Sequence, residues 1–437
     1  MSLDSEEIRK RQQRRAEMRA RQRAEQRKVY FGLAAAAVVL IAVAVVIFMA
    51  SRGSAGIQDP QPTETQVQTQ PPTQPATQTG AVTAEEPMME PTTVIRVAAI
   101  GDLIATDKVV ASGVTGGGYD YTEMLMDVAP LLADADLTVM NFEGILDGEP
   151  YGGEKQSAPI ELMQALRRAG VDAVQLANSC SINNGLRGLS ATINSVKTAG
   201  MESVGTFQTA EAFQKSKGFT MMEVGGMRVA LVAFTKGMDG MGLPAGSEDC
   251  VNLLYTDYES SYQTVDKAGI QDILENIADE EPDVTIALLH WGSEFNDQLS
   301  DSQETIRSLM LSGGVDVIIG THSHYVQRID HDPEAGTLVA YSLGDFVGKG
   351  ERAGTNYSVV LNLEITRDNI TGETKVTDYS YTPIYTVSDE TKVRIVRIRE
   401  AMVGFEAGYI QRVSQEDYDS MAYALERIEA RIHPEEE

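Results

Sequence analysis

Two histidines separated by one residue follow a strongly apolar segment of this 437-residue chain. They belong to Gly320-Thr321-His322-Ser323-His324, and the run 315–319 before them is typical of a buried parallel strand. A second apolar run, residues 284–289, leads into His290. Imidazole is the commonest transition-metal ligand in proteins, and ligand-binding loops gather at the carboxyl ends of such strands. Three of the five histidines at predicted strand ends therefore indicate a metal site.

Two acidic residues occupy equivalent places, because Asp102 and Glu143 also follow apolar runs. Carboxylates and imidazoles together suit divalent Zn, Mn or Fe, and one or two such ions could clamp a phosphoryl-like oxygen centre. Singly, each residue has another explanation: Asp102 could cap a helix, Glu143 could be a solvated loop acid, and a histidine could be structural. Their shared position at strand ends favours the metal. We expect His331 and His433 to lie on the surface.

The charge distribution excludes one class of partner. The net charge of −28 is uneven: residues 1–28 carry ten basic and five acidic side chains, and residues 95–437 carry −29. So acidic a region is not expected to bind nucleic acid nonspecifically, because that requires a basic surface. With only Cys180 and Cys250 present, the chain is no disulfide scaffold, although these two could pair outside the membrane.

The N-terminal quarter predicts a membrane anchor. Residues 29–51 carry no charge and as a helix would span roughly 34 Å, enough to cross a bilayer. The basic arm 1–28 precedes them, so the positive-inside rule places this arm in the cytoplasm and the remainder outside. A cleaved signal peptide is the alternative, but the apolar segment is long, the basic region before it is extended, and Ser51-Arg52-Gly53 is a poor small-residue cleavage site. Residues 52–93, rich in Pro, Thr and Gln, are expected to be a flexible tether.

Strands and helices alternate from residue 94 onward, and hairpins interrupt the series. Gly225-Gly226 between two apolar runs is a strong hairpin signal, and two more hairpins are expected at 327–343 and 358–385. We expect a domain over 94–388 with a mixed sheet system and helices outside it. Residues 389–437 are expected to form an acidic, helical tail.

Five short motifs occur in a fixed order within residues 99–347. They are Ala99-Ile100-Gly101-Asp102, Asn141-Phe142-Glu143-Gly144, His290-Trp291-Gly292-Ser293-Glu294, Gly320-Thr321-His322-Ser323-His324-Tyr325-Val326-Gln327 and Tyr341-Ser342-Leu343-Gly344-Asp345-Phe346-Val347. This set resembles the CapA family of poly-γ-glutamate capsule biosynthesis proteins, relatives of calcineurin-like metallophosphoesterases. The resemblance implies an α/β fold, a four-layer α/β/β/α metallophosphoesterase-like sandwich with the metal site at one edge. Here it would be preceded by one transmembrane helix.

The resemblance also assigns site residues. The metal positions it implies are Asp102, Glu143, Asn178, His290, His322 and His324. Glu294 matches the acidic residue after His-Trp-Gly and, with Cys180, is a candidate catalytic residue. The chain departs from the pattern where the family shows Asn-Asn-His, because it has Asn178-Ser179-Cys180. Asp345 stands where Asn is common.

Cys180 has three interpretations: a soft metal ligand in place of histidine, a partner for Cys250, or a small buried residue. As a general acid it would be a poor substitute, because its unperturbed pKa is about 8.5 and it lacks the reach of imidazole. The loss of one positioned acid typically costs about 10²–10⁴ in rate, so the change bears directly on hydrolysis.

Three hypotheses about function follow. The first is a membrane-anchored, extracellular protein for synthesis, export or attachment of an anionic surface polymer, poly-γ-glutamate in the family, acting beside a synthase complex in the same membrane. The second is a metal-dependent phosphoesterase or related hydrolase. The third is a non-catalytic scaffold or polymer-binding module on the same fold.

Overall fold

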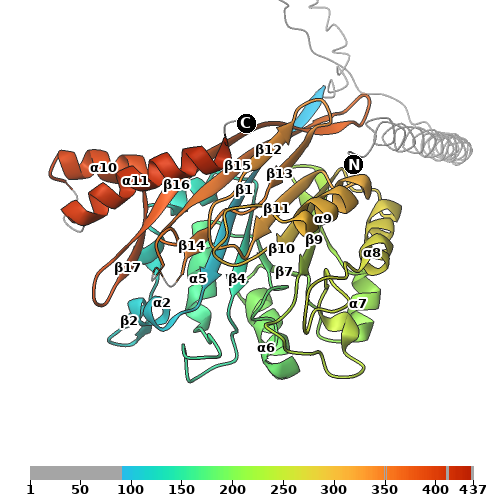
Figure 1. The fold of residues 1–437 in the computed structure, drawn as a ribbon, viewed down its shortest axis with the longest axis horizontal. Coiled ribbons are helices and arrows are strands. Elements are labelled where there is room, and N and C mark those ends of the chain that lie inside the picture. Colours follow the sequence, from blue (N-terminus) through green and yellow to red (C-terminus); the bar gives the residue numbers. More distant parts are fainter. Residues whose placement is uncertain (1–90, 349, 351, 410–412, 435–437) are drawn as a thin grey trace, which may run out of the picture. The chain divides into compact units, whose positions relative to one another are not determined.

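Two β-sheets and the helices around them make up the part of the protein described by the computed structural model (Figure 1). This part comprises residues 91–434 apart from 349, 351 and 410–412. The mixed α/β class expected from the sequence is confirmed.

The first sheet has eight strands, with β1 (Thr92–Ile104) in the middle. In spatial order the others are β17 (Val393–Arg397), β16 (Thr374–Ser388) and β15 (Tyr357–Asp368) on one side of β1, and β4 (Leu137–Glu143), β5 (Ala173–Gln175) and β7 (Glu202–Val204) on the other; β14 (Asp345–Val347) also pairs with β1. β4, β5 and β14 run parallel to their neighbours, whereas β15 to β17 are antiparallel. All seven residues of β4 are buried, as expected of a parallel strand covered on both faces.

The second sheet has six strands. Their order is β12 (Ile329–Asp332), β13 (Thr337–Ala340), β11 (Val317–Thr321), β10 (Val284–His290), β9 (Met227–Thr235) and β8 (Thr220–Val224). β8 and β9 form the hairpin predicted from Gly225-Gly226, and β12 and β13 form another. β9, β10, β11 and β13 are parallel to one another, so their carboxyl ends meet at one edge.

Helices cover the outer faces and one end of the sheets, and three short strands lie outside the large sheets. The helices are α2 (Asp107–Ser112), α3 (Thr122–Leu125), α4 (Ala129–Ala133), α5 (Ile160–Ala169), α6 (Gly185–Thr198), α7 (Ala210–Ser216), α8 (Lys267–Asp279), α9 (Asp301–Ser312), α10 (Ile398–Glu406) and α11 (Gln415–Ile432); the strands are β2 (Val114–Thr115), β3 (Gly118–Tyr119) and β6 (Asn183–Asn184).

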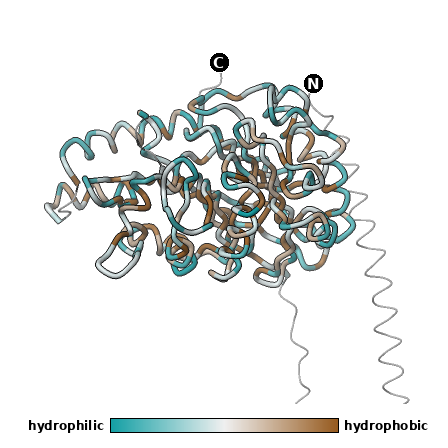
Figure 2. Tube along the Cα trace, turned by 90° about the horizontal axis from the view of Figure 1, so that it is seen from below, coloured by the Kyte–Doolittle hydropathy of each residue, from teal (hydrophilic) through white to brown (hydrophobic). Residues whose placement is uncertain are grey.

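Three hydrophobic cores define the layers. The innermost core contains side chains of both sheets, such as Val139 and Ile286. The second joins the outer face of the first sheet to α5, for example through Leu162. The third joins the second sheet to α8 and α9 through Ile270 and Ile306. The order is therefore helix, sheet, sheet, helix, and hydrophobic residues gather in the interior of the trace in Figure 2.

The C-terminal segment departs from its prediction. The prediction of a helical tail from residue 389 onward is wrong at its start, because Val393–Arg397 is strand β17, which pairs with β16. Val393 and Ile395 are buried and Arg394 is not, which is the two-residue period of a strand. α10 and α11 follow, and the apolar face of α11 joins the innermost core through Met421, Ala424 and Ile428.

Residues 122–133 form two short helices, α3 and α4, instead of one continuous helix. Pro130 lies in the first turn of α4, where its missing N–H is tolerated, but it could not lie inside a continuous helix without removing a hydrogen bond. The break does not affect the strands that carry the candidate ligands.

The predicted arm 1–28, the predicted transmembrane helix 29–51 and residues 52–90 of the predicted tether lie outside the described residues. β1 begins at Thr92, close to the predicted domain start at 94. Among the helices in the described part of the chain, none has both the length and the apolar composition needed to cross a bilayer.

Candidate metal centre

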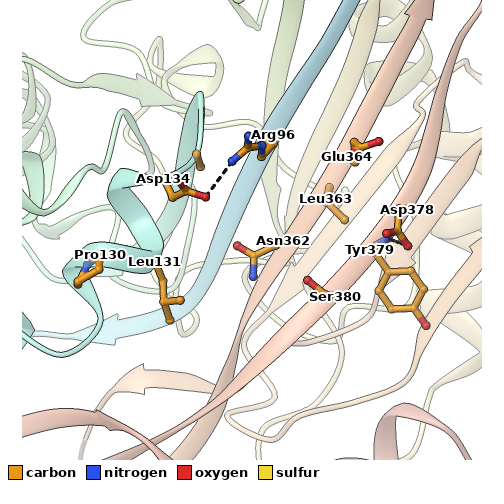
Figure 3. A pocket seen from close by; sticks show the side chains of 11 residues that line it. Arg96, Pro130, Leu131, Asp134, Asn362, Leu363, Glu364, Asp378, Tyr379 and Ser380 are labelled. Atoms are coloured by element: carbon orange, nitrogen blue, oxygen red, sulfur yellow. Dashed lines mark hydrogen bonds and ion pairs between the residues drawn. The ribbon is translucent and has the colours of Figure 1, made fainter. Parts of the chain in front are cut away.

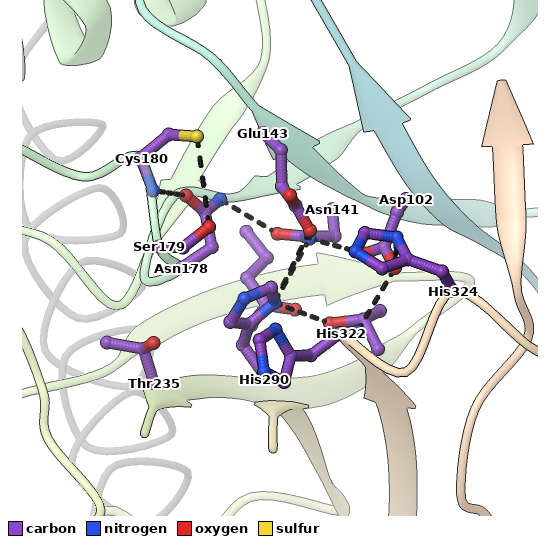
Figure 4. A network of polar contacts seen from close by, with 12 residues as sticks. Asp102, Asn141, Glu143, Asn178, Ser179, Cys180, Thr235, His290, His322 and His324 are labelled. Atoms are coloured by element: carbon purple, nitrogen blue, oxygen red, sulfur yellow. Dashed lines mark hydrogen bonds and ion pairs between the residues drawn. The ribbon is translucent and has the colours of Figure 1, made fainter. Parts of the chain in front are cut away.

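The carboxyl ends of four strands bring the strand-end ligands together (Figure 4). In the first sheet, Asp102 of β1 pairs with Asn141 of the parallel strand β4, which ends at Glu143. In the second sheet, His290 ends β10, and His322 and His324 follow β11. A hydrogen bond of 3.1 Å from the His322 backbone N–H to Asp102 Oδ2 joins the two sheets. All six predicted ligands, including Asn178, are buried.

Three of these residues form a compact group. One ligand atom each from Asp102, Glu143 and His290 lies within 4.8 Å of the other two. The Asn141 amide donates to Asp102 Oδ1 at 2.6 Å and to Glu143 Oε1 at 3.4 Å, so it fixes both carboxylates. His290 Nδ1 lies 3.7 Å from Glu143 Oε1. The register of β1 shifts between Ile100 and Asp102, and such bulges re-aim side chains next to functional sites.

A second group shares Asp102 with the first. Asp102, His324 and Asp345 also offer ligand atoms within 4.8 Å of one another. His324 Nδ1 lies 2.7 Å from Asp345 Oδ1 and 4.0 Å from Asp102 Oδ2. Sequence reasoning did not propose Asp345 as a site residue. The Gly344-Asp345 dipeptide after an apolar strand was the signal in the sequence that could have identified it. In the structure, β14 places Asp345 in register with Asp102.

The histidine rings leave buried nitrogens without partners. Nδ1 and Nε2 of His322 and Nε2 of His290 have no hydrogen-bond partner, and the two ring centres lie 4.4 Å apart. His322 belongs to neither group of three but lies beside both. An unsatisfied buried polar atom costs about 1–3 kcal/mol, and a bound cation would satisfy these nitrogens. The donor set therefore fits a divalent metal.

The ionisation of the site supports this fit. Burial lowers the pKa of His290 and His322 well below the usual value, so both imidazoles are neutral and offer lone pairs. Burial also raises the pKa of Asp102, and it raises the pKa of Glu143 well above its ordinary value, with the nearby Asp102 adding to the effect. A cation between these carboxyl groups would stabilise their charged forms.

His324 differs from the other two histidines. Burial lowers its pKa, but the hydrogen bonds to Asp345 and Glu294 outweigh burial and raise the pKa to about 12. Without a metal, His324 is therefore an imidazolium held between carboxylates. His322 and His324 also have left-handed backbones, with φ of 87° and 61°. Each such conformation costs about 1–3 kcal/mol, and residues of this kind cluster at functional sites.

Comparison with known proteins identifies the family. The model of a family described as bacterial capsule synthesis protein PGA_cap matches residues 96–349, more than half of the chain. The chain belongs to this family. The resemblance to CapA proteins that the five motifs predicted is thereby confirmed, and the matched segment contains both groups of ligands.

Several relatives of this PGA_cap chain are known. Capsule biosynthesis protein CapA of Bacillus anthracis is 28% identical over 259 residues, 58% of this chain and 59% of that protein. PGA biosynthesis protein CapA of Bacillus subtilis is 23% identical over 334 residues, 72% of this chain and 80% of that protein. The chain thus spans about three fifths of the length of the first. Among solved structures, a calcineurin-like phosphoesterase from Bacillus subtilis is 15% identical, with a TM-score of 0.41 over 77% of this chain and all of that one.

The departure from the family motif lies beside the centre. Asn178 Nδ2 donates to Asn141 Oδ1 at 2.9 Å and to Phe142 O at 2.7 Å, and its Oδ1 accepts from the Cys180 N–H at 2.9 Å. Its amide is thus engaged with Asn141 rather than turned toward the carboxylates. Asn178 supports the centre through Asn141.

Cys180 is a buried thiol outside both groups of ligands. It donates to Gln156 Oε1 at 2.6 Å, and it is not paired with Cys250, since both cysteines are free. Burial, with a smaller effect of Glu143, raises the pKa of Cys180 well above its usual value, so the thiol stays protonated. Of the three interpretations, the small buried residue agrees best with these contacts.

Glu294 lies at the rim of the centre. Its side chain is 49% exposed, and its Oε1 lies 3.9 Å from His324 Nε2. It is the only predicted site residue with a half-exposed side chain, so it is the one that solvent or a ligand reaches first.

We predict that Cys180→Ala changes the metal affinity less than about threefold, because the thiol contacts Gln156 rather than the ligands. Asn141→Ala is the contrasting variant, since outer partners of metal ligands typically contribute about 10–100-fold in affinity. Titration of chelator-stripped protein with Mn²⁺ or Zn²⁺ measures both. A drop for Cys180→Ala as large as that for Asn141→Ala would show that Cys180 is a ligand.

The raised pKa values of Asp102 and Glu143 predict that metal affinity rises with pH. Because burial raises the pKa of Asp102 and Glu143, protons compete with the metal until the pH exceeds these values. His290 and His322 are neutral and add no such competition, whereas the protonated His324 must lose its proton before it can bind a metal. Each displaced proton makes the affinity change roughly tenfold per pH unit. Calorimetry in two buffers with different ionisation heats measures the release, and binding without it would contradict this account.

A groove in the first sheet lies away from the centre (Figure 3). It lies over β1, β15, β16 and α4, and an ion pair of 2.9 Å joins Arg96 to Asp134. Arg96 precedes Asp102 by six residues of the same strand, or about 20 Å. Both charged side chains are mostly exposed, so the pair adds little to stability. The groove contains no histidine or cysteine and does not extend the metal centre.

Proposed function

We propose that this PGA_cap protein is a membrane-anchored, extracellular protein that acts in synthesis, export or attachment of capsule poly-γ-glutamate, with a divalent metal at the centre described above. The match over residues 96–349 carries the proposal. The names of the two Bacillus relatives, which refer to capsule and PGA biosynthesis, agree with it.

The metal part of the proposal depends on the donor set. Asp102, Glu143 and His290 would hold one ion, and Asp102, His324 and Asp345 are placed for a second. Mn, Zn and Fe are the candidates because they accept both imidazole and carboxylate ligands. When bound, such an ion acts as a Lewis acid toward an anionic oxygen.

The membrane part depends on the sequence alone. Residues 29–51 are uncharged and follow a basic arm, which favours a single-pass anchor with a cytoplasmic N-terminus. A tether over 52–93 would hold the domain outside the membrane, within reach of a synthase complex in the same bilayer. Protease added to intact cells should then degrade residues 94–437, whereas protection of this part would contradict the topology.

Charge limits how the domain could contact its polymer. Residues 95–437 carry −29, so they repel a polyanion, although salt screens the repulsion beyond about 8 Å. Contact with carboxylates is therefore best provided by the metal. An ion held by the buried histidines and carboxylates could accept a carboxylate oxygen of the polymer as a further ligand.

A second candidate function is a scaffold or polymer-binding module without hydrolysis. It is favoured by Cys180, which stands where the family has histidine and whose raised pKa keeps the thiol protonated and a weak acid at neutral pH. The hydrolase alternative requires metal-dependent turnover, which an aryl phosphate assay with Mn²⁺ or Zn²⁺ tests. Absence of turnover in protein that binds the metal favours the scaffold.

Gene deletion with complementation tests the main proposal. We expect deletion to reduce cell-attached extracellular polyanion, wild type and His331→Ala to restore it, and His290→Ala to fail. His331 is a suitable control because its Nε2 contacts Val376 O, outside the centre. Unchanged amount and anchoring of the polymer after deletion would overturn the role in capsule synthesis. Full restoration by His290→Ala would show that the metal is dispensable.

A further inference from the structure

The C-terminal helix α11 contacts two loops that carry the metal centre. The first loop, residues 292–300, follows β10 and contains Glu294 and Phe295. The second loop, residues 322–328, follows β11 and contains His322 and His324. α11 lies beyond residue 349, where the match to the family model ends. Its contacts with the loops are therefore not part of the family pattern reported above.

Two arginines on successive turns of α11 reach the first loop. Arg431 Nη2 lies 3.2 Å from Asp297 Oδ2, and Arg427 Nη2 lies 3.4 Å from the same oxygen. Arg431 is the more enclosed, with 11% of its side chain exposed against 39% for Arg427. Burial raises the pKa of Asp297, but the hydrogen bond from Gln298 and the charge of Arg431 outweigh this and lower it. The carboxylate is therefore charged at neutral pH, as a charge-assisted hydrogen bond requires.

The same arginine also contacts the second loop. The Arg431 guanidinium carbon lies 4.7 Å from the ring centre of Tyr325, the residue after His324. Nη1 donates to Tyr357 Oη of β15 at 3.2 Å, which fixes the guanidinium on the first sheet. One side chain thus connects the sheet, the first loop and the second loop.

The two loops are also joined to each other over His324. The Phe295 ring stacks on the His324 ring with centres 5.0 Å apart, and the Phe295 N–H donates to Ser323 O at 2.8 Å. Gln327 Nε2 donates to Asn296 O at 2.9 Å. Phe295 and His324 both have left-handed backbones, with φ of 54° and 61°. Such conformations persist only where the surroundings hold them.

We propose that Arg431, assisted by Arg427, is a positioning residue of the metal centre. Its contacts with Asp297 and Tyr325 hold both loops in the strained conformation that directs His322 and His324 toward Asp102. The inference rests on the metal centre of the proposed function. It assigns to the C-terminal helix a role in metal affinity rather than in packing alone.

Metal titration of the full-length protein in detergent, stripped with chelator, tests the inference. Arg431→Ala is expected to weaken Mn²⁺ or Zn²⁺ binding roughly tenfold, the lower end of the range for outer-shell partners. Arg431→Lys should be intermediate, because it keeps the charge but not the planar fork. The matched control is Glu429→Gln on the same helix, which removes the charge of a side chain that accepts a hydrogen bond from Tyr381 Oη at 2.8 Å but touches neither loop. Hydrogen exchange of metal-free protein should accelerate in both loops in Arg431→Ala and not in Glu429→Gln.

Asp297→Asn provides a second route if Arg431→Ala does not fold. This substitution removes the charge of Asp297, the partner of Arg431 on the first loop, and should weaken metal binding to a similar degree. In a double variant with Arg431→Ala the two losses of metal affinity should not add fully, because both substitutions remove the same Arg431–Asp297 contact. Metal affinity and loop exchange in Arg431→Ala and Asp297→Asn equal to those of Glu429→Gln would overturn the inference while the metal centre stands. A wild-type protein that binds no metal would instead overturn the centre, and the positioning role with it.

Discussion

His290→Ala is expected to reduce divalent-metal affinity at least about 100-fold. The substitution removes a direct ligand, and even the loss of a residue that only hydrogen-bonds to a ligand typically reduces affinity about 10–100-fold. His290 is fully buried, its Nε2 has no partner, and its Nδ1 is 3.7 Å from Glu143. Metal at 100 times its Kd should stabilise the wild type by about 2.7 kcal/mol. The variant should show no such stabilisation. Thermal unfolding of chelator-stripped protein, with and without Mn²⁺ or Zn²⁺, measures the difference.

His331→Ala is the control for this experiment. His331 lies in β12 at the edge of the second sheet, and its Nε2 contacts a backbone oxygen of β16. The metal should stabilise this variant as it does the wild type. Equal stabilisation of the His290→Ala variant would mean that any ion binds elsewhere, and the proposed centre would be rejected.

The strand ends could be predicted because burial on both faces leaves a simple pattern. β4 and β10 are buried throughout, so each appears in the sequence as a mostly apolar run, and the charged or imidazole side chain at the end of the run must lie at the edge of the sheet. That pattern led to Glu143 and His290. The family motifs then distinguished these residues from ordinary loop acids and structural histidines, which composition alone could not do.

The rest of the centre depends on contacts between distant segments. Asp345 joins Asp102 only because β14 pairs with β1, a pairing that follows no local periodicity. Asn141 was part of a motif, yet its role as a donor to both Asp102 and Glu143 follows from the parallel register of β1 and β4. Arg431 lies over 130 residues from Asp297 in sequence, in a segment that the sequence predicted only as an acidic, helical tail.

The error at β17 has the same origin. Val393, Ile395 and Arg397 lie in a charge-rich segment next to two true helices, so a helix was the natural local assignment. Pairing with β16 satisfies the backbone hydrogen bonds of this segment and buries Val393 and Ile395, whose β-branched side chains favour a strand. The alternation of Val393, Arg394 and Ile395 was the local sign of a strand, and it is too short to outweigh the helical pattern that follows.

Gly101→Ala is expected to destabilise the fold by at least about 3 kcal/mol, the upper range for overpacked cores. A Cβ at position 101 would lie 1.8 Å from Gly344 O and 3.0 Å from Gly344 C, both backbone atoms that cannot rotate away. β1 would have to separate from the segment before β14, breaking the 3.0 Å hydrogen bond from Asp102 N–H to Gly344 O. Asp102 would then shift, so metal affinity should fall with stability. Urea unfolding followed by fluorescence of Trp291, the single tryptophan, measures the first effect.

Gly117→Ala is the matched control. Gly117 lies between β2 and β3, and a Cβ there would meet no atom within 4 Å. Its stability should stay within about 0.5 kcal/mol of the wild type, as for surface changes away from special features. The two substitutions add the same methyl group, so the difference between them isolates the close approach of β1 to Gly344. If Gly101→Ala were as stable as Gly117→Ala, the close approach of Gly101 to Gly344 would not constrain β1. Asp102 would then be held in place only by its hydrogen bonds with Asn141 and the His322 backbone.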